Sequence, residues 1–267
     1  MSGSLADYGE AALLNHLFGG VPYSVSTTLY FGYMVGVPGE TGPGAEPNFG
    51  GYERIGVTNN TINFPLTANQ IKQNGTEIQF SEATANHGLV QAVGVWDSPT
   101  SGNMIAYFPL VAPINIGIGD AMRIPPAALT VQFNTGGLSN YVKNALLNML
   151  FGNTPFNIVP ILYFGYATTT PTDAAAGTEP NAGGYARVGL ANNTNLFPVA
   201  TLGSKANAAD INFLEATASQ GTITSIQILD ALSGGNYLGR YPLSTPQAIS
   251  VGTIPTIPSN TLTITLD

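Results

Sequence analysis

The sequence predicts a mainly β protein made of two tandem antiparallel β-sandwich domains, each preceded by a short N-terminal α-helix. Its 267 residues include 32 glycines and 19 prolines, and only 8% of them are charged, against about 25% in a typical soluble domain. This composition favours short strands joined by many turns over long helices, which need glutamate and lysine on their solvated faces. A hydrophobic fraction of 44% is enough to build a sizeable core.

An internal repeat with a constant offset divides the chain into two copies of one unit. The LYFGY segment at residues 29–33 recurs unchanged at 162–166, an offset of 133 residues, and the same offset relates the EPN segment at 46–48 to that at 179–181 and the EATA segment at 82–85 to that at 215–218. The two copies align along their whole length at this offset without a gap. We therefore expect a first β-sandwich domain at 1–133 and a second at 134–267, each within the usual size range of a domain.

Each copy begins with a pattern that is typical of an amphipathic helix. In the second copy Ser139 is a candidate N-cap, Leu138 precedes it as a possible staple, and Gly152 follows the last apolar residue. The apolar residues of the two expected stripes recur at helical spacing: Leu5, Tyr8, Ala12, Leu13 and Leu17 in the first copy, and Tyr141, Val142, Ala145, Leu146 and Leu150 in the second.

After each helix the apolar residues alternate at period two, which indicates strands. The expected strands of the first copy are residues 29–33, 51–57, 77–80, 89–96, 104–110, 114–118 and 129–133, with counterparts in the second copy that end at Leu262, Ile264 and Leu266. Short strands separated by Gly, Pro and Asn clusters match an antiparallel sandwich better than a parallel α/β fold. Residues 37–50 and 168–183 are too rich in Pro, Gly, Ala and Thr for regular structure and are expected to form long surface loops.

Charge and composition exclude several classes of function. Seven Lys and Arg against fifteen Asp and Glu give a formal net charge of −8, so no basic surface is left for nucleic acid. The absence of cysteine excludes disulfides, zinc–thiolate sites and thiol chemistry. The N-terminus lacks the positively charged start of a secretory signal, and no apolar run reaches the roughly 18 residues of a membrane span. We expect a soluble protein made in the cytoplasm, with no membrane partner.

Candidate catalytic residues are few, and each has a simpler structural interpretation. The two histidines are not duplicated: His16 corresponds to Met149 and His87 to Gln220, which suits surface or packing residues. No Gly-x-Ser-x-Gly motif is present. Paired carboxylates would suffice for glycoside cleavage, and three acids do recur in the second copy, where Glu46, Glu82 and Asp97 become Glu179, Glu215 and Asp230.

Structural roles account for these acids. We expect Arg54 to hold its glycine-rich loop through Glu46 or Glu82, and Arg187 to do the same through Glu179 or Glu215. Asp97 and Asp230 precede Gly-Asn pairs and predict hairpin turns in which the aspartate accepts hydrogen bonds from the backbone.

The remaining alternatives are a calcium site and a sugar platform. A calcium site of Asp, Asn and loop carbonyls lacks a regular ligand spacing. A sugar platform of Tyr30, Phe31, Tyr33 and Tyr52 is less consistent with period-two alternation than core packing is. We predict no catalytic, cofactor-binding or metal-binding residues, and no cofactor.

The order of motifs resembles a family of small virion proteins of tailed bacteriophages. The motifs are LLNxLFG in the helix, LYFGY, EPxxGGYxR, NNT followed by FP, FxEATA and a closing LTITLD, with the clearest copy at 138–267 and the looser one at 5–134. The resemblance covers nearly the whole chain and implies a non-enzymatic structural protein of the tail fibre or capsid-decoration type. The tandem duplication departs from the usual single copy.

The resemblance, together with the lack of a catalytic set, leads us to expect a capsid decoration or cement protein that binds and stabilises the assembled shell. Its partners would be the major capsid protein or other virion proteins, and its lightly charged surface suggests a homo-oligomer. The alternative is a tail-fibre or receptor-binding module that contacts a host-surface glycan or receptor, and an enzyme acting on glycans is a third, more distant alternative.

Overall fold

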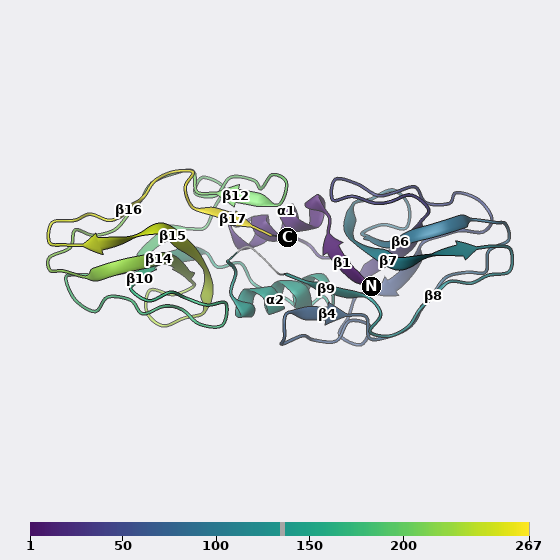
Figure 1. Ribbon diagram of the computed structural model, residues 1–267, viewed down its shortest axis with the longest axis horizontal. Helices are drawn as coiled ribbons and strands as arrows, with labels where there is room; N and C mark the ends of the chain where they lie inside the picture. Colours follow the sequence, from purple (N-terminus) through teal and green to yellow (C-terminus); the bar gives the residue numbers. More distant parts are fainter. Residues whose placement is uncertain (134–136, 267) are drawn as a thin grey trace.

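The computed structural model describes residues 1–133 and 137–266. The molecule is elongated: one β-rich body lies at each end, and both helices and the last strand, β17, lie near the middle (Figure 1). The first body contains β1 (Ser2–Leu5), α1 (Asp7–Leu17), β2 (Thr28–Met34), β3 (Ile55–Thr58), β4 (Ile71–Gln73), β5 (Ile78–Gln79), β6 (Gly88–Trp96), β7 (Met104–Ile116), β8 (Arg123–Ile124) and β9 (Thr130–Gln132).

The second body repeats this order at the predicted offset. It contains α2 (Asn140–Leu150), β10 (Ile161–Ala167), β11 (Val188–Ala191), β12 (Ser204–Ala206), β13 (Ile211–Asn212), β14 (Gly221–Leu229), β15 (Tyr237–Ile249), β16 (Thr256–Ile257) and β17 (Thr263–Thr265). Every one of these elements begins and ends 133 residues after its counterpart, so the mainly β fold and the tandem repeat are confirmed. Among the described residues, no helix is long and apolar enough to cross a membrane.

Each body is a sandwich whose main sheet is antiparallel. In the first, the strand order is β3-β2-β6-β7-β1-β9-β4, and the pair β5-β8 lies beside it. In the second, the main sheet is β11-β10-β14-β15, with the pairs β12-β17 and β13-β16. The sheet of the first body contains one parallel contact, between β1 and β9. In the second body, Leu138 forms a single bridge to Gly239, and residues 135 and 136 of the segment equivalent to β1 lie outside the described residues.

The apolar alternation that predicted the strands is the alternation that fills the core. Leu29, Phe31 and Tyr33 in β2 are at most 2% exposed, and their counterparts Leu162, Phe164 and Tyr166 are at most 1% exposed. A single hydrophobic cluster continues through both bodies. Burial of apolar surface stabilises a protein by about 25 cal/mol per Å². Because the buried cluster includes residues of both sandwiches, it stabilises both of them and the contact between them.

The boundaries differ from the prediction in three places. Leu5 lies on β1 and not on the helix, and Tyr8 and Tyr141 are too exposed to belong to the buried stripes. The strand predicted at 51–57 begins only at Ile55, because Gly50 and Gly51 have φ angles of +65° and +75° and form a turn. The strands predicted at 104–110 and 114–118 are one strand, β7, which ends at Ile116.

Three short strands of the first body, β1, β4 and β8, were not predicted. Each has at most four residues, and their pairing partners are distant in sequence. The helix cap was predicted correctly, since Ser139 accepts a hydrogen bond from the Val142 N–H. The loops at 37–50 and 168–183 contain no strand or helix, as expected.

Candidate functional site

The duplicated arginine is a structural clamp in both repeats. Arg54 Nε lies 3.0 Å from Glu46 Oε1, and its Nη1 donates to the carbonyl oxygens of Ser98 and Ser101 at 3.0 and 2.7 Å. The guanidinium also lies 3.8 Å above the ring of Trp96, a cation–π contact. Arg54 therefore ties the loop that carries Glu46 to the turn that follows β6.

The same clamp recurs around Arg187, which donates to both oxygens of Glu179 and to the carbonyls of Ala231 and Gly234. Tyr185 donates to Glu179 as well, at 2.8 Å. Burial by itself raises the pKa of Glu179, but the hydrogen bonds from Arg187 and Tyr185 outweigh it, and the pKa lies below its ordinary value. Of the two acids predicted as partners in each repeat, Glu46 and Glu179 are the ones used, whereas Glu82 and Glu215 are exposed.

The remaining predicted residues also have structural contacts. Asp97 Oδ1 accepts from the Asn103 N–H at 2.8 Å, and Asp230 Oδ1 accepts from the Asn236 N–H at 2.6 Å. In each turn the other aspartate oxygen accepts from the side chain of the same asparagine. The aspartate thus closes a turn by accepting hydrogen bonds from the asparagine six residues later, as the Gly-Asn pairs predicted. Within the described residues, no three His, Asp or Glu side chains gather as a metal-binding group.

Both histidines are buried and hydrogen-bonded. His87 lies 2.7 Å from the Tyr33 hydroxyl and 3.1 Å from the Gly50 carbonyl. Gln220 replaces it in the second repeat, where it bonds the Tyr166 hydroxyl and the Gly183 carbonyl. In the second repeat an amide therefore makes the hydrogen bonds that the imidazole makes in the first; of the surface and packing roles expected for His87, its burial at 6% exposed matches packing.

His16 joins segments from both repeats. Its Nδ1 accepts from the Tyr23 N–H at 3.2 Å, so the neutral ring carries its proton on Nε2 and donates it to the Phe156 carbonyl at 2.7 Å.

The feature that sequence reasoning missed is the contact between the two repeats. The C-terminal end of α1 enters the second repeat, where Asn192 accepts from the Gly19 N–H at 2.6 Å and donates to the Leu17 carbonyl at 3.0 Å. The C-terminal end of α2 enters the first repeat, where Asn59 makes the same two bonds to Gly152 and Leu150. Each helix end is thus capped by an asparagine of the other repeat, which satisfies backbone groups that a helix leaves unpaired.

Two buried lysines belong to the same contact. Lys72 Nζ lies 2.9 Å from Asn148 Oδ1 on α2, and Lys205 Nζ lies 2.6 Å from Asn15 Oδ1 on α1. Both lysines are at most 4% exposed, and a cation near a helix C-terminus is stabilised by the helix dipole. The chain has only three lysines, and two of them recur in register at this place. That recurrence is the sequence signal that could have identified the contact.

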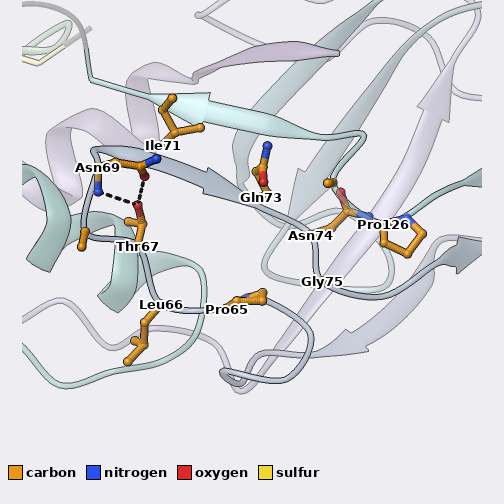
Figure 2. Close-up of a pocket in the computed structure, with 11 residues that line it drawn as sticks. Pro65, Leu66, Thr67, Asn69, Ile71, Gln73, Asn74, Gly75 and Pro126 are labelled. Carbon is orange, nitrogen blue, oxygen red and sulfur yellow. Dashed lines mark hydrogen bonds between the residues drawn. The ribbon is translucent and has the colours of Figure 1, made fainter.

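An open groove of about 650 Å³ lies on the first repeat beside this contact (Figure 2). Leu66, Thr67 and Asn69 come from one side of the groove, Ile71 and Gln73 from β4, and Pro126 from the loop after β8. Thr67 Oγ1 donates to Asn69 Oδ1 at 2.8 Å, one of the dashed lines in Figure 2. None of the lining residues is titratable, so the groove can offer hydroxyl, amide and apolar contacts but no acid–base chemistry.

The second repeat positions the wall of this groove. Asn148 on α2 accepts from the Thr67 N–H at 2.9 Å and donates to the Thr67 carbonyl at 3.1 Å. Asn144 accepts from the Gln70 N–H at 2.8 Å. The shape of the groove therefore depends on the pairing of the repeats.

No curated protein matches the chain. A family profile described as podophage GP4 fiber I protein gp80 matches it twice, over residues 4–132 and 137–265. The two matches coincide with the two repeats and together span nearly all of the sequence, so the chain belongs to the podophage GP4 fiber I protein gp80 family and carries its unit in duplicate.

Proposed function

We propose that this protein is a structural component of a phage fibre, which acts through protein contacts and catalyses no reaction. Membership of the family makes the chain a structural protein of a phage virion. The proposal that the protein lies in the fibre depends on the match to a family of fibre proteins. This match favours the tail-fibre alternative over capsid decoration.

The shape of the molecule supports this function. The arrows of β7 and β15 point to opposite ends of the long axis (Figure 1), so the loops that follow these strands lie at the two tips. Ile118 and Val251 occupy equivalent positions in these loops and are 75% and 69% exposed. An elongated body with an exposed aliphatic side chain at each tip can join neighbouring virion proteins, or contact a host-surface glycan or receptor, at both ends.

The chemistry of the described residues supports a role without catalysis. Glu46 and Glu179 each form an ion pair with an arginine. Asp97 and Asp230 close turns. His16 and His87 make structural hydrogen bonds. We propose other virion proteins as partners, and further copies of the chain among them.

Locating the protein in purified particles tests the proposal. Antibodies against the chain are expected to label the tail in electron micrographs, and quantitative mass spectrometry is expected to give far fewer copies than of the major capsid protein. Particles that lack the protein are expected to adsorb poorly to cells but to release DNA on heating at the same temperature as complete particles. Label spread over the head, with earlier DNA release from deficient particles, would replace the fibre with a capsid decoration protein. Turnover of a cell-wall glycan by the purified chain would overturn both.

A further inference from the structure

The contact between the repeats is reciprocal. Asn192 holds the end of α1, and Asn59 holds the end of α2. Lys205 bonds Asn15, and Lys72 bonds Asn148. In every case residue i of one repeat meets residue j of the other, and residue j of the first meets residue i of the second. Such reciprocity is the property of a two-fold, self-complementary interface, as in a symmetric dimer.

An aromatic side chain from each repeat completes the core of the other. Phe151, just after α2, packs against Phe64 of the first repeat with ring centroids 5.9 Å apart, and Phe64 stacks on Phe31 at 6.1 Å. Phe18 packs in the same way against Phe197 at 5.5 Å, and Phe197 lies 6.3 Å from Phe164. Phe18 and Phe151 are 0% and 3% exposed. Neither sandwich core is complete without the phenylalanine of the other repeat.

Six of the contact positions carry the same residue in both repeats, although His16 and Asn144, which also bond the other repeat, correspond to Met149 and Ala11. The contact positions pair as Asn15 and Asn148, Phe18 and Phe151, Gly19 and Gly152, Asn59 and Asn192, Phe64 and Phe197, and Lys72 and Lys205. By contrast, the exposed positions Phe49, Val111 and Leu214 correspond to Ala182, Ser244 and Ser81. A repeat with this contact set can pair with another copy of itself, because the donor and the acceptor surface are both present on each copy.

We propose that the helix-docking surface of each repeat is a self-association site for a second copy of the repeat, and that the chain is a covalently linked pseudo-dimer. The partner is a helix that ends in Asn-x-x-Phe-Gly. The docking surface binds the asparagine side chain with a lysine, the backbone of the helix end with an asparagine, and the phenyl ring with a phenylalanine. A covalent connection supplies the second copy at an effective concentration of the order of millimolar. The uncut chain therefore pairs within itself at micromolar concentration, and the link is not required for the pairing itself. This inference concerns the purified chain and stands independently of where the protein lies in the virion.

Cutting the link between the repeats in the full chain tests the proposal. A specific protease site is placed between residues 133 and 137, and the full chain is folded, purified and then cut. The two fragments are expected to elute together with the mass of the uncut protein, 27.7 kDa apart from the inserted site. Their common melting temperature is expected to rise with protein concentration, whereas that of the uncut chain stays constant, because only the cut form dissociates on unfolding. Separation into two folded fragments at micromolar concentration would overturn the proposal.

Refolding the cut protein tests whether like repeats pair. Two preparations are cut, one of them with an affinity tag on the second repeat, and they are mixed, unfolded and refolded. The tagged second repeat is expected to retain untagged second repeat as well as first repeat on the affinity column. Recovery of unlike pairs only would show that the site selects the other repeat and would overturn self-association.

Matched phenylalanine variants connect the result to the docking surface. In the cut protein, Phe151→Leu is expected to raise the concentration needed to keep the fragments paired far less than Phe151→Ala does, because leucine keeps most of the buried apolar surface. Phe49→Ala, at a half-exposed position away from the contact, is the control and is expected to leave pairing unchanged. Equal effects of Phe151→Ala and Phe49→Ala on dissociation would contradict the assignment. If Phe151→Ala fails to fold, Phe151→Leu still provides the comparison.

Discussion

Replacement of Arg187 by alanine removes five hydrogen bonds from a clamp that is mostly closed to water. The Arg187 side chain is 10% exposed and that of Glu179 is 21% exposed. Breaking a fully buried pair costs about 3–5 kcal/mol, and an exposed pair contributes about 0.2–1 kcal/mol. Because Glu179 keeps some contact with water and retains Tyr185 as a donor, we expect Arg187→Ala to lower the free energy of unfolding by about 2–3 kcal/mol.

Thermal melting measures this loss of stability, and its dependence on pH identifies Glu179 as the partner. At about 2–4 °C per kcal/mol for a chain of this size, the melting temperature is expected to fall by about 4–12 °C near neutral pH. The pKa of Glu179 is depressed in the folded protein, so its stabilising effect is present above the unfolded value of 4.5 and is lost as the pH falls through the folded value. The difference between wild type and variant is therefore expected to shrink when both are melted at about pH 3.

A second ion pair provides the control. Arg123 lies 3.7 Å from Glu77, and their side chains are 58% and 43% exposed, so Arg123→Ala is expected to change stability by less than about 1 kcal/mol. Arg187→Lys retains the charge but cannot bond the carboxylate and two carbonyls at once, and it should melt between the wild type and Arg187→Ala. Equal melting temperatures for Arg187→Ala and Arg123→Ala would refute the clamp as the source of stability.

Three further predictions concern the helix ends. Burial lowers the pKa of Lys72 and of Lys205 from 10.5 to about 8. Between about pH 8 and 10 the unfolded chain therefore binds more protons than the folded one, and urea titrations should show the free energy of unfolding rising with pH over this range. The rise should be smaller in the Lys72→Met, Lys205→Met double variant. Gly152→Ala places a Cβ 3.1 Å from the Phe64 and Asn148 carbonyl oxygens at a φ of +128° and should cost about 1–3 kcal/mol by chemical denaturation, more than Gly88→Ala, where the φ is +89° but the surrounding space is open. Ser139→Ala removes the N-cap of α2 and should lower the free energy of unfolding by about 1 kcal/mol, and an unchanged value would show that the cap bond to the Val142 N–H contributes nothing.

The sequence by itself determined the repeat, the strand-rich fold and the pairing of each duplicated arginine with an acid of its own repeat. Period-two alternation in β2 and β10 reports burial on one face of a strand, and that burial is a local property of the chain. The cap at Ser139 and the turns at Asp97 and Asp230 are local as well, since donor and acceptor lie within six residues of each other. Duplication strengthened these predictions, because a residue kept in both copies, such as Arg54 and Arg187, indicates a role that the fold itself requires.

Only the tertiary structure decided which body covers which side chain. The apolar stripe of α2 predicts that Leu150 is buried but does not show that Phe151 enters the core of the other repeat. Asn59 and Lys72 have the appearance of ordinary polar residues in a loop and a strand, and their partners lie 93 and 76 residues away. The choice of Glu46 over Glu82, and the pairing of β1 with β7 and β9, depend in the same way on contacts between distant segments. Periodicity records how much surface an element buries, whereas the identity of the surface that buries it is fixed only when distant segments pack together.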